Sequence, residues 1–412
     1  MRAYDLIVVG AGIASGSLIY NLLKQGFKGS VLAVDRLDAV AQGPSAFSAG
    51  GFRNLWTTSI NQQLCSKSID ILRGYKDEMG VSCGFKQTGY LFTYYSKAWE
   101  RIPEAAKIWA DNGVNFELWK PEQIEAKIPG LKCGIDHIDS EVAEYLEFEP
   151  IVGGVFGNDC GAFDPSQAAV GYFEKSATFD NRPTVLLRTE VTKILFDSHG
   201  KAEGVVIREG SGTEETVMGG IVALCSGPWT NRLLEQSGIP VEHRMPIISQ
   251  KRMLFITDFP NPDPRWMDIP MTIIDQGIYF KEEAGNLMIG KAKKDSPDTL
   301  EAEFEPDYYV EEINLPMQER IPSTAVCKLK SGWASFYDTV TADHNAILGW
   351  HDEYPNLLLQ VGYSGHGAME SPAAGHCLAE LIITGKYQSI DCTPLRWGRF
   401  RENQLVHEKI VI

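Results

Sequence analysis

The 412-residue sequence is poor in the features that mark metal-binding, disulfide-rich and membrane-spanning proteins. Its eight cysteines are scattered without any Cys-x-x-Cys pair, a spacing that fits neither a zinc site nor a dense disulfide scaffold. No apolar stretch is long enough to span a bilayer, and the first motif begins at about the fourth residue, which leaves no room for a signal peptide. We therefore expect a cytoplasmic protein with reduced thiols, no metal site and no transmembrane segment.

Positive charge is also scarce. The sequence has 38 Lys and Arg against 54 Asp and Glu, which gives a net charge of −16. Nucleic-acid binding needs a net or local excess of Lys and Arg, and no dense basic run is present, so nucleic acid is not an expected partner. A hydrophobic fraction of 44% is ordinary for a globular protein with a sizeable core, and the length predicts two or three domains.

The first 35 residues predict a compact strand–helix–strand unit. Residues 4–9 form a short apolar run that is typical of a buried parallel strand. Apolar residues recur at helical spacing over residues 14–25, and Gly26 follows as a helix stop. A second buried strand is expected at residues 30–34, directly before Asp35.

A glycine motif connects this first strand to the helix. Gly10 permits a tight turn, Gly12 allows the backbone to approach a pyrophosphate, and Ser15 is small enough for close helix packing. Asp35 follows Ser15 by twenty residues, at the distance suited to an acceptor for a ribose hydroxyl. The motif predicts dinucleotide binding rather than a purely structural turn, but it does not distinguish NAD from FAD.

The remaining sequence alternates between helical and strand patterns, which predicts an α/β fold. Helices are expected at residues 59–75, 120–130 and 368–384. Strands are expected at residues 88–95, 185–197, 204–208, 221–225, 252–257, 277–281, 286–290 and 356–361.

Several later segments resemble the D-amino-acid oxidase family of flavoproteins, which includes sarcosine oxidase, glycine oxidase and dimethylglycine dehydrogenase. These segments are Ser45–Arg53 (SAFSAGGFR), Ala223–Trp229 (ALCSGPW), Trp333–Asp338 (WASFYD) and Val361–Gly375 (VGYSGHGAMESPAAG). Two short segments of the tail, residues 385–391 and 399–400, are also similar to a mitochondrial FAD-dependent oxidoreductase-domain protein implicated in the assembly of respiratory complex I.

The resemblance implies a Rossmann-like FAD-binding domain of the glutathione-reductase type, with an inserted α+β substrate domain built on a mixed sheet. The FAD-binding domain is expected at residues 1–85, 145–235 and 325–412, and the substrate domain at 86–144 and 236–324. The FAD-contacting residues that the resemblance implies are Gly10, Gly12, Ile13, Ser15, Asp35, Arg36, Ser45, Ser48, Ala49, Gly50, Gly51, Val191, Ser226, Gly227, Trp229, Gly362, Ser364, Gly365, His366, Gly367, Ala368 and Met369.

Two departures from the family bear on the flavin chemistry. Members with covalent flavin place a His or a Cys where this sequence has Ser48 and Ser335, so the FAD is expected to be non-covalent. Met288 stands where related oxidases have a Lys that promotes reaction with oxygen, which favours a dehydrogenase.

Three residues are candidates for the reaction itself. Arg53 matches a family position that binds the substrate carboxylate, although a surface or phosphate-side arginine is an equal alternative. Tyr337 is expected to pack against the flavin ring or to supply a hydroxyl, and His366 to hold its loop or to act in catalysis. Lys251 and Arg252 are interpreted as a solvated pair rather than as site residues.

The implied reaction is hydride transfer from the α-carbon of a small amino acid, or of an N-substituted one, to N5 of the flavin. Oxidation of a 2-hydroxy acid such as 2-hydroxyglutarate is an alternative reaction that the sequence does not exclude. Two further alternatives are a flavin-binding scaffold and an electron-transfer subunit of a larger complex. The electron acceptor (oxygen, a quinone or another protein) and the oligomeric state, homo- or hetero-oligomeric, are not determined by the sequence.

Overall fold

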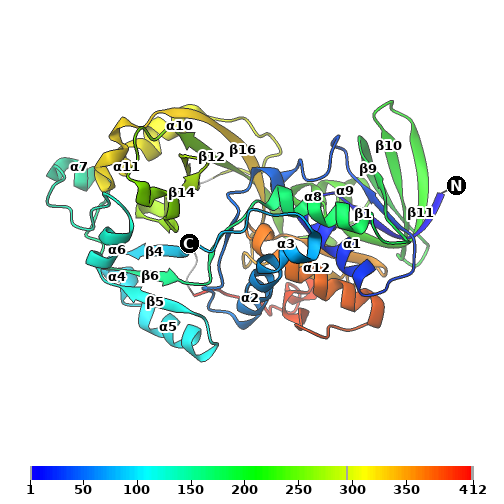
Figure 1. Cartoon of the computed structure of the whole chain (residues 1–412). Helices are drawn as coiled ribbons and strands as arrows, with labels where there is room; N and C mark the ends of the chain where they lie inside the picture. The colour runs from blue at the N-terminus through cyan, green and yellow to red at the C-terminus, as the bar shows by residue number, and fades with distance from the viewer. Residues whose placement is uncertain (1, 294–295, 410–412) are drawn as a thin grey trace.

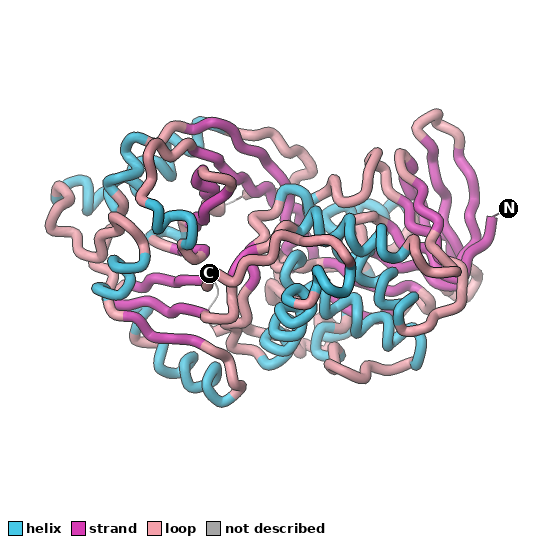
Figure 2. The backbone as a smooth tube through the Cα atoms, viewed as in Figure 1, coloured by secondary structure: helices cyan, strands magenta, loops and turns pink. Residues whose placement is uncertain are grey.

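The computed structural model describes residues 2–293 and 296–409, and it contains two large mixed sheets at opposite ends of the molecule (Figures 1 and 2). The first sheet has the order β17-β18-β11-β1-β2-β8, with β10 joined to β11 and β9 joined to β10. Its strands are β1 (Arg2–Val9), β2 (Val31–Val34), β8 (Thr184–Leu186), β9 (Thr189–Phe196), β10 (Ala202–Glu209), β11 (Glu214–Leu224), β17 (Ile347–Trp350) and β18 (Leu357–Val361).

The second sheet has the order β16-β12-β15-β14-β13-β4-β6-β5. Its strands are β4 (Tyr90–Tyr94), β5 (Phe116–Trp119), β6 (Gly153–Gly157), β12 (Ile247–Thr257), β13 (Met271–Ile273), β14 (Tyr279–Glu283), β15 (Asn286–Gly290) and β16 (Leu329–Val340). A small pair, β3 (Gly51–Phe52) with β7 (Gly161–Ala162), lies apart from both sheets.

Helices α1, α2, α8 and α12 pack on one another beside the first sheet (Figure 1). The α-helices are α1 (Ile13–Lys24), α2 (Ser59–Arg73), α3 (Tyr75–Met79), α4 (Ser96–Trp99), α5 (Ile102–Asp111), α6 (Pro121–Lys127), α7 (Ser140–Tyr145), α8 (Pro165–Ser176), α9 (Thr230–Gln236), α10 (Pro306–Tyr309), α11 (Leu315–Arg320) and α12 (Gly367–Thr384). No helix in the described part of the chain is long and apolar enough to cross a membrane.

Strand β1 explains why the N-terminal segment folds as the sequence predicts. Leu6 and Val8 face a core formed with α1 and α12, while Ile7 and Val9 face a second core formed with β9, β10 and α9. Because both faces of the strand are covered, the run is continuously apolar rather than alternating. The predicted α/β class with a mixed second sheet is confirmed, since β13 pairs with β4 in parallel while its other neighbour, β14, is antiparallel.

The structure departs from the sequence-based elements in two places. Residues 185–197 form two strands rather than one, because Arg188 has a left-handed φ of 52° that turns the chain from the edge of β2 to β10. Strands β6 and β16 belong to the second sheet, although residues 153–157 and 329–340 were assigned to the FAD-binding domain. Strands β6 and β16 belong to the second sheet because they pair with its strands. Strand pairing joins segments that are far apart in the sequence, so the sequence alone does not show to which sheet a strand belongs.

A buried ion pair holds the second sheet to its covering loops. The guanidinium of Arg320 is fully buried and donates to both carboxylate oxygens of Asp275 at 2.7 and 2.6 Å. It also donates to the carbonyls of Lys132 and Glu149 at 3.0 and 3.1 Å, which ties that connecting segment to α11.

We expect Asp275→Asn to lower the free energy of unfolding by about 3–5 kcal/mol, because it leaves a buried guanidinium without its counter-charge. Urea unfolding monitored by tryptophan fluorescence checks this value. Asp38→Asn is the matched control, since Asp38 and Arg188 are exposed and 3.8 Å apart, and its midpoint should stay at the wild-type value. Equal midpoints for the two variants would contradict the prediction.

Candidate functional site

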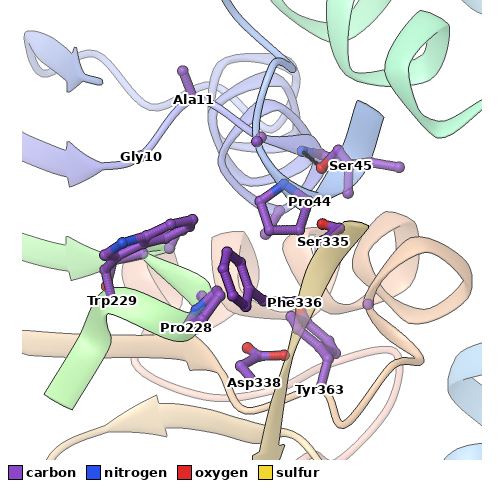
Figure 3. Close-up of a pocket in the computed structure, with 18 of the residues that line it drawn as sticks. Gly10, Ala11, Pro44, Ser45, Pro228, Trp229, Ser335, Phe336, Asp338 and Tyr363 are labelled. Atoms are coloured by element: carbon purple, nitrogen blue, oxygen red, sulfur yellow. Dashed lines mark hydrogen bonds between the residues drawn. The ribbon is translucent and has the colours of Figure 1, made fainter. Parts of the chain in front are cut away.

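An elongated cavity lies where the carboxyl ends of β1, β11 and β18 meet, which is the edge at which ligands bind in open α/β sheets. Its wall comes from segments far apart in sequence, and Figure 3 shows Gly10, Ser45, Trp229, Phe336 and Tyr363 around the same space. Predicted cofactor residues that line it are Gly10, Gly12, Ile13, Asp35, Arg36, Ser45, Ser48, Ala49, Val191, Ser226, Gly227, Trp229, Gly365, Gly367 and Ala368.

The N-terminus of α1 forms an anion-binding end of this cavity. Gly10 has a φ of 108°, and a Cβ there would lie 2.5 Å from the carbonyl oxygen of Cys225. The N–H of Ile13 donates to Ser45 Oγ at 3.1 Å, whereas the N–H groups of Gly12 and Ala14 have no protein acceptor among the described residues. These free donors and the helix dipole suit a pyrophosphate, so the residues present fit a dinucleotide.

Asp35 and Arg36 lie at the end of β2, beside the same cavity. The Asp35 carboxylate accepts from the N–H of Ala11 at 2.7 Å and from the N–H of Leu37 at 2.9 Å. These two bonds hold the acid at the wall, and each oxygen retains a lone pair for a ribose hydroxyl. The guanidinium of Arg36 lies 4.1 Å from the ring centre of Trp229, which gives the cavity a flat, cationic side.

A second and wider cavity of about 1290 Å³ adjoins the first. Predicted residues that line this second cavity are Ser48, Ala49, Gly50, Gly51, Arg53, Tyr337, Ser364, Gly365, His366, Ala368 and Met369. The residues common to both cavities are Ser48, Ala49, Arg252, Tyr279, Tyr337, Gly365 and Ala368. The two spaces therefore adjoin one another at these residues. Ser15 and Gly362 line neither cavity and lie behind the wall.

The loop before α12 is shaped for close approach to a flat ligand. Gly365 has a φ of 94°, and a Cβ there would lie 2.3 Å from the ring of Tyr337. The N–H groups of Gly367 and Ala368 have no protein acceptor among the described residues, because the helix begins at Gly367. These donors can stabilise the negative charge that a flavin carries when it is reduced. Tyr337 packs on this loop.

His366 is a neutral residue of the wall. Its ring meets the Trp56 ring edge-on at 4.5 Å, and no hydrogen bond from its side chain occurs among the described residues. Burial, reinforced by the nearby charge of Arg53, holds the pKa of His366 well below its ordinary value. We therefore propose that His366 holds the loop by packing on Trp56 rather than by a hydrogen bond.

Arg53 is the charged group at the inner wall of the second cavity. Only 7% of the residue is exposed, and its guanidinium lies 4.4 Å from the ring of Trp56 and 5.4 Å from that of Phe92. No carboxylate lies within ion-pair distance of it among the described residues. The alternative of a surface or phosphate-side arginine is wrong, since Arg53 is buried and does not line the first cavity.

The structure changes the interpretation of Lys251, Arg252 and Met288. Arg252 lines both cavities, so the interpretation of Lys251 and Arg252 as a solvated pair is wrong for Arg252. Lys251 also departs from it, because its amine pairs with Glu305 and is largely buried. Met288 is buried in β15 and lines neither cavity, so it gives no support for a dehydrogenase over an oxidase.

Sequence reasoning did not single out two buried acids near the site. Asp338 lines the first cavity and accepts from the N–H of Gly362 at 2.7 Å, while burial raises its pKa to about 6. Glu370 lies in the first turn of α12, and burial, together with Glu408, raises its pKa to about 8. Both residues lie in segments that resemble the flavoprotein family, Trp333–Asp338 and Val361–Gly375, but nothing in the sequence shows that their carboxyl groups are desolvated.

Comparison with known proteins agrees with this geometry. The family model described as DAO, FAD dependent oxidoreductase, matches residues 5–381. The FAD-dependent oxidoreductase domain-containing protein 1 of Xenopus laevis is 25% identical over 432 residues, which cover 99% of this chain and 85% of that protein. The monomeric sarcosine oxidase of Bacillus sp. (strain B-0618) is 26% identical over 397 residues, which cover 93% of each chain.

A solved structure shares the fold. The L-proline dehydrogenase from P. horikoshii has a TM-score of 0.84 and 23% identity, covering 98% of this chain and 100% of that one. The family match spans most of the chain, and the first cavity has the free backbone donors and the acid that a dinucleotide needs. The chain therefore belongs to the DAO family of FAD-dependent oxidoreductases, and its cofactor is FAD.

Proposed function

We propose that the protein oxidises the C–N bond of a small amino acid or an N-substituted amino acid in the second cavity. The observation that carries this proposal is Arg53, a buried guanidinium with no acidic partner among the described residues. Bound FAD supplies the hydride acceptor for such an oxidation. The protein itself supplies binding, orientation and exclusion of water.

Arg53 is suited to a substrate carboxylate for electrostatic reasons. A charge held out of water without a counter-charge is costly, and an incoming carboxylate offsets that cost. The guanidinium is also planar and matches a carboxylate through two parallel N–H bonds. The rings of Trp56, Tyr90 and Phe92 hold it in one orientation, so that it presents the substrate in one pose.

The tyrosines and the histidine of the wall provide no strong base. Tyr90 is buried and Tyr279 is half-buried, and desolvation raises the pKa of each phenol, so both stay protonated at neutral pH. His366 is neutral because its pKa is depressed. Hydride removal from a neutral amine needs no dedicated base, which is consistent with this set of residues.

The experiment is an anaerobic absorbance titration of the purified protein with sarcosine, dimethylglycine, proline, glycine, D-amino acids and 2-hydroxyglutarate. We expect an amine to bleach the flavin band, and readmission of air then separates an oxidase from a dehydrogenase. Bleaching by 2-hydroxyglutarate alone would replace the amine by a hydroxy acid. A bound flavin that no compound reduces would contradict the proposal and favour a scaffold or an electron-transfer subunit.

A further inference from the structure

The second cavity contains two kinds of cation. Lys291 and Lys293 line it, but the amine of each is paired with an acid, Glu312 and Glu305 respectively, at 2.9 Å. Arg53 and Arg252 also line it, and neither has a carboxylate within 4.0 Å among the described residues. Among the described residues, the two arginines are therefore the cations of this cavity that lack an acidic partner.

Arg252 is held in place with part of its guanidinium free. It donates to the carbonyl of Lys251 at 2.9 Å and to Gln250 Oε1 at 3.1 Å, and it lies 5.0 Å from the ring centre of Tyr337. Gln250 is itself fixed by a bond from Thr339 Oγ1 at 2.9 Å. A guanidinium has five N–H donors, so two bonds leave donors available for a ligand.

Three tyrosines, Tyr90, Tyr279 and Tyr337, line the same cavity as the two arginines. Arg53 is 5.6 Å from the ring centre of Tyr90, and Arg252 is 5.0 Å from that of Tyr337. Each guanidinium group therefore lies beside a tyrosine ring inside the same cavity.

We infer that the substrate carries two acidic groups, one bound by Arg53 and the second by Arg252. The inference rests on the proposed function, and it narrows the substrate to amino acids with a second carboxylate on the side chain or on the N-substituent. Each carboxylate offsets one cation that the fold leaves without a counter-charge. A monocarboxylate would leave Arg252 unmatched, so the site discriminates against it.

The acidic residues of this cavity do not oppose such a ligand. Glu305 and Glu312 are paired with lysines. The other four acids that line the cavity, Glu147, Glu303, Asp307 and Glu311, are exposed at the rim, where solvent screens their charge. The inner wall is therefore cationic, while the rim is acidic.

Binding of ligands that cannot be oxidised tests the inference without turnover. We expect glutarate to perturb the flavin absorbance at concentrations about ten-fold or more below those of butyrate, since it makes one more charge-assisted pair. Arg252→Gln should weaken glutarate binding about ten-fold or more and leave butyrate unchanged, while Arg252→Lys should retain part of the difference. The bound flavin spectrum shows that each variant is folded.

Lys251→Gln is the matched control. Lys251 is the neighbour of Arg252 on β12, but its amine is paired with Glu305 and it lines neither cavity. Its removal should leave glutarate affinity within about two-fold of the wild type, because its amine is bound to Glu305, which stays paired with Lys293. An equal effect of Lys251→Gln and Arg252→Gln would overturn the inference, as would equal affinities of the wild type for glutarate and butyrate.

Reduction experiments separate this inference from the proposed function. Iminodiacetate and glutamate should reduce the flavin at lower concentrations than sarcosine and 2-aminobutyrate do. Glutarate binding that depends on Arg252, with no amine reducing the flavin, would overturn amine oxidation and support the two-carboxylate site. Reduction by monocarboxylates alone would support amine oxidation and overturn the two-carboxylate substrate.

Discussion

Arg53→Gln is expected to lower the second-order rate constant of flavin reduction by roughly 100- to 1000-fold, while FAD stays bound. Truncating one partner of a buried charge pair costs about 3–4 kcal/mol, which corresponds to that range. Arg53 does not line the first cavity, so the cofactor contacts are not altered. Anaerobic stopped-flow reduction with a substrate identified by the absorbance titration measures the constant, and the flavin spectrum reports occupancy.

Two outcomes decide whether Arg53 is the carboxylate anchor. Arg53→Lys should recover part of the rate, because it restores the charge but not the paired N–H donors. A lower affinity with an unchanged limiting rate constant is expected for a group that binds the carboxylate alike before and during hydride transfer. Wild-type reduction kinetics in Arg53→Gln would exclude Arg53 as the anchor.

Gly10→Val is expected to give a protein that purifies without FAD. The left-handed φ of 108° is unfavourable for a β-branched residue, and a Cβ would lie 2.5 Å from the Cys225 carbonyl oxygen. The turn must then shift, and with it the free N–H groups at the start of α1 that suit a pyrophosphate. The ratio of flavin absorbance to protein absorbance after purification measures the loss, which we expect to be nearly complete.

Gly26→Val is the matched control for this variant. Gly26 also has a left-handed φ, 92°, but a Cβ there would meet nothing within 4 Å. The control therefore carries the backbone strain without the collision, at the other end of α1. It should retain FAD and lose only some thermal stability. Loss of FAD from both variants would mean that strain in α1, rather than the geometry of the Gly10 turn, removes the cofactor.

The N-terminal unit shows how much of the fold is encoded locally. The apolar run of β1, the glycine turn and α1 all lie where the sequence predicts them. Each depends on neighbouring residues alone, because a buried parallel strand is apolar on both faces and a tight turn needs glycine. The strand at residues 185–197 was predicted less well, since the break at Arg188 depends on which strands its two halves join.

The second cavity shows what the sequence did not reveal. Alternation along β12 predicts that Lys251 and Arg252 point to opposite faces of the sheet, but not which face borders the cavity. That depends on β16, which pairs with β12 from about 80 residues further along the chain. Arg53 is similar, because its burial requires Tyr90 and Phe92 of β4 to close around it, in addition to Trp56 of its own loop.

The sequence by itself thus determined the dinucleotide-binding turn, the α/β class and, through its resemblance, the flavoprotein family. The tertiary structure decided which charges lack a partner, and therefore which of them are available to a substrate. The physical reason is that a strand or a turn is selected by short-range sterics and burial pattern. The state of a charged side chain depends instead on desolvation and on counter-charges that distant segments bring to within a few ångströms.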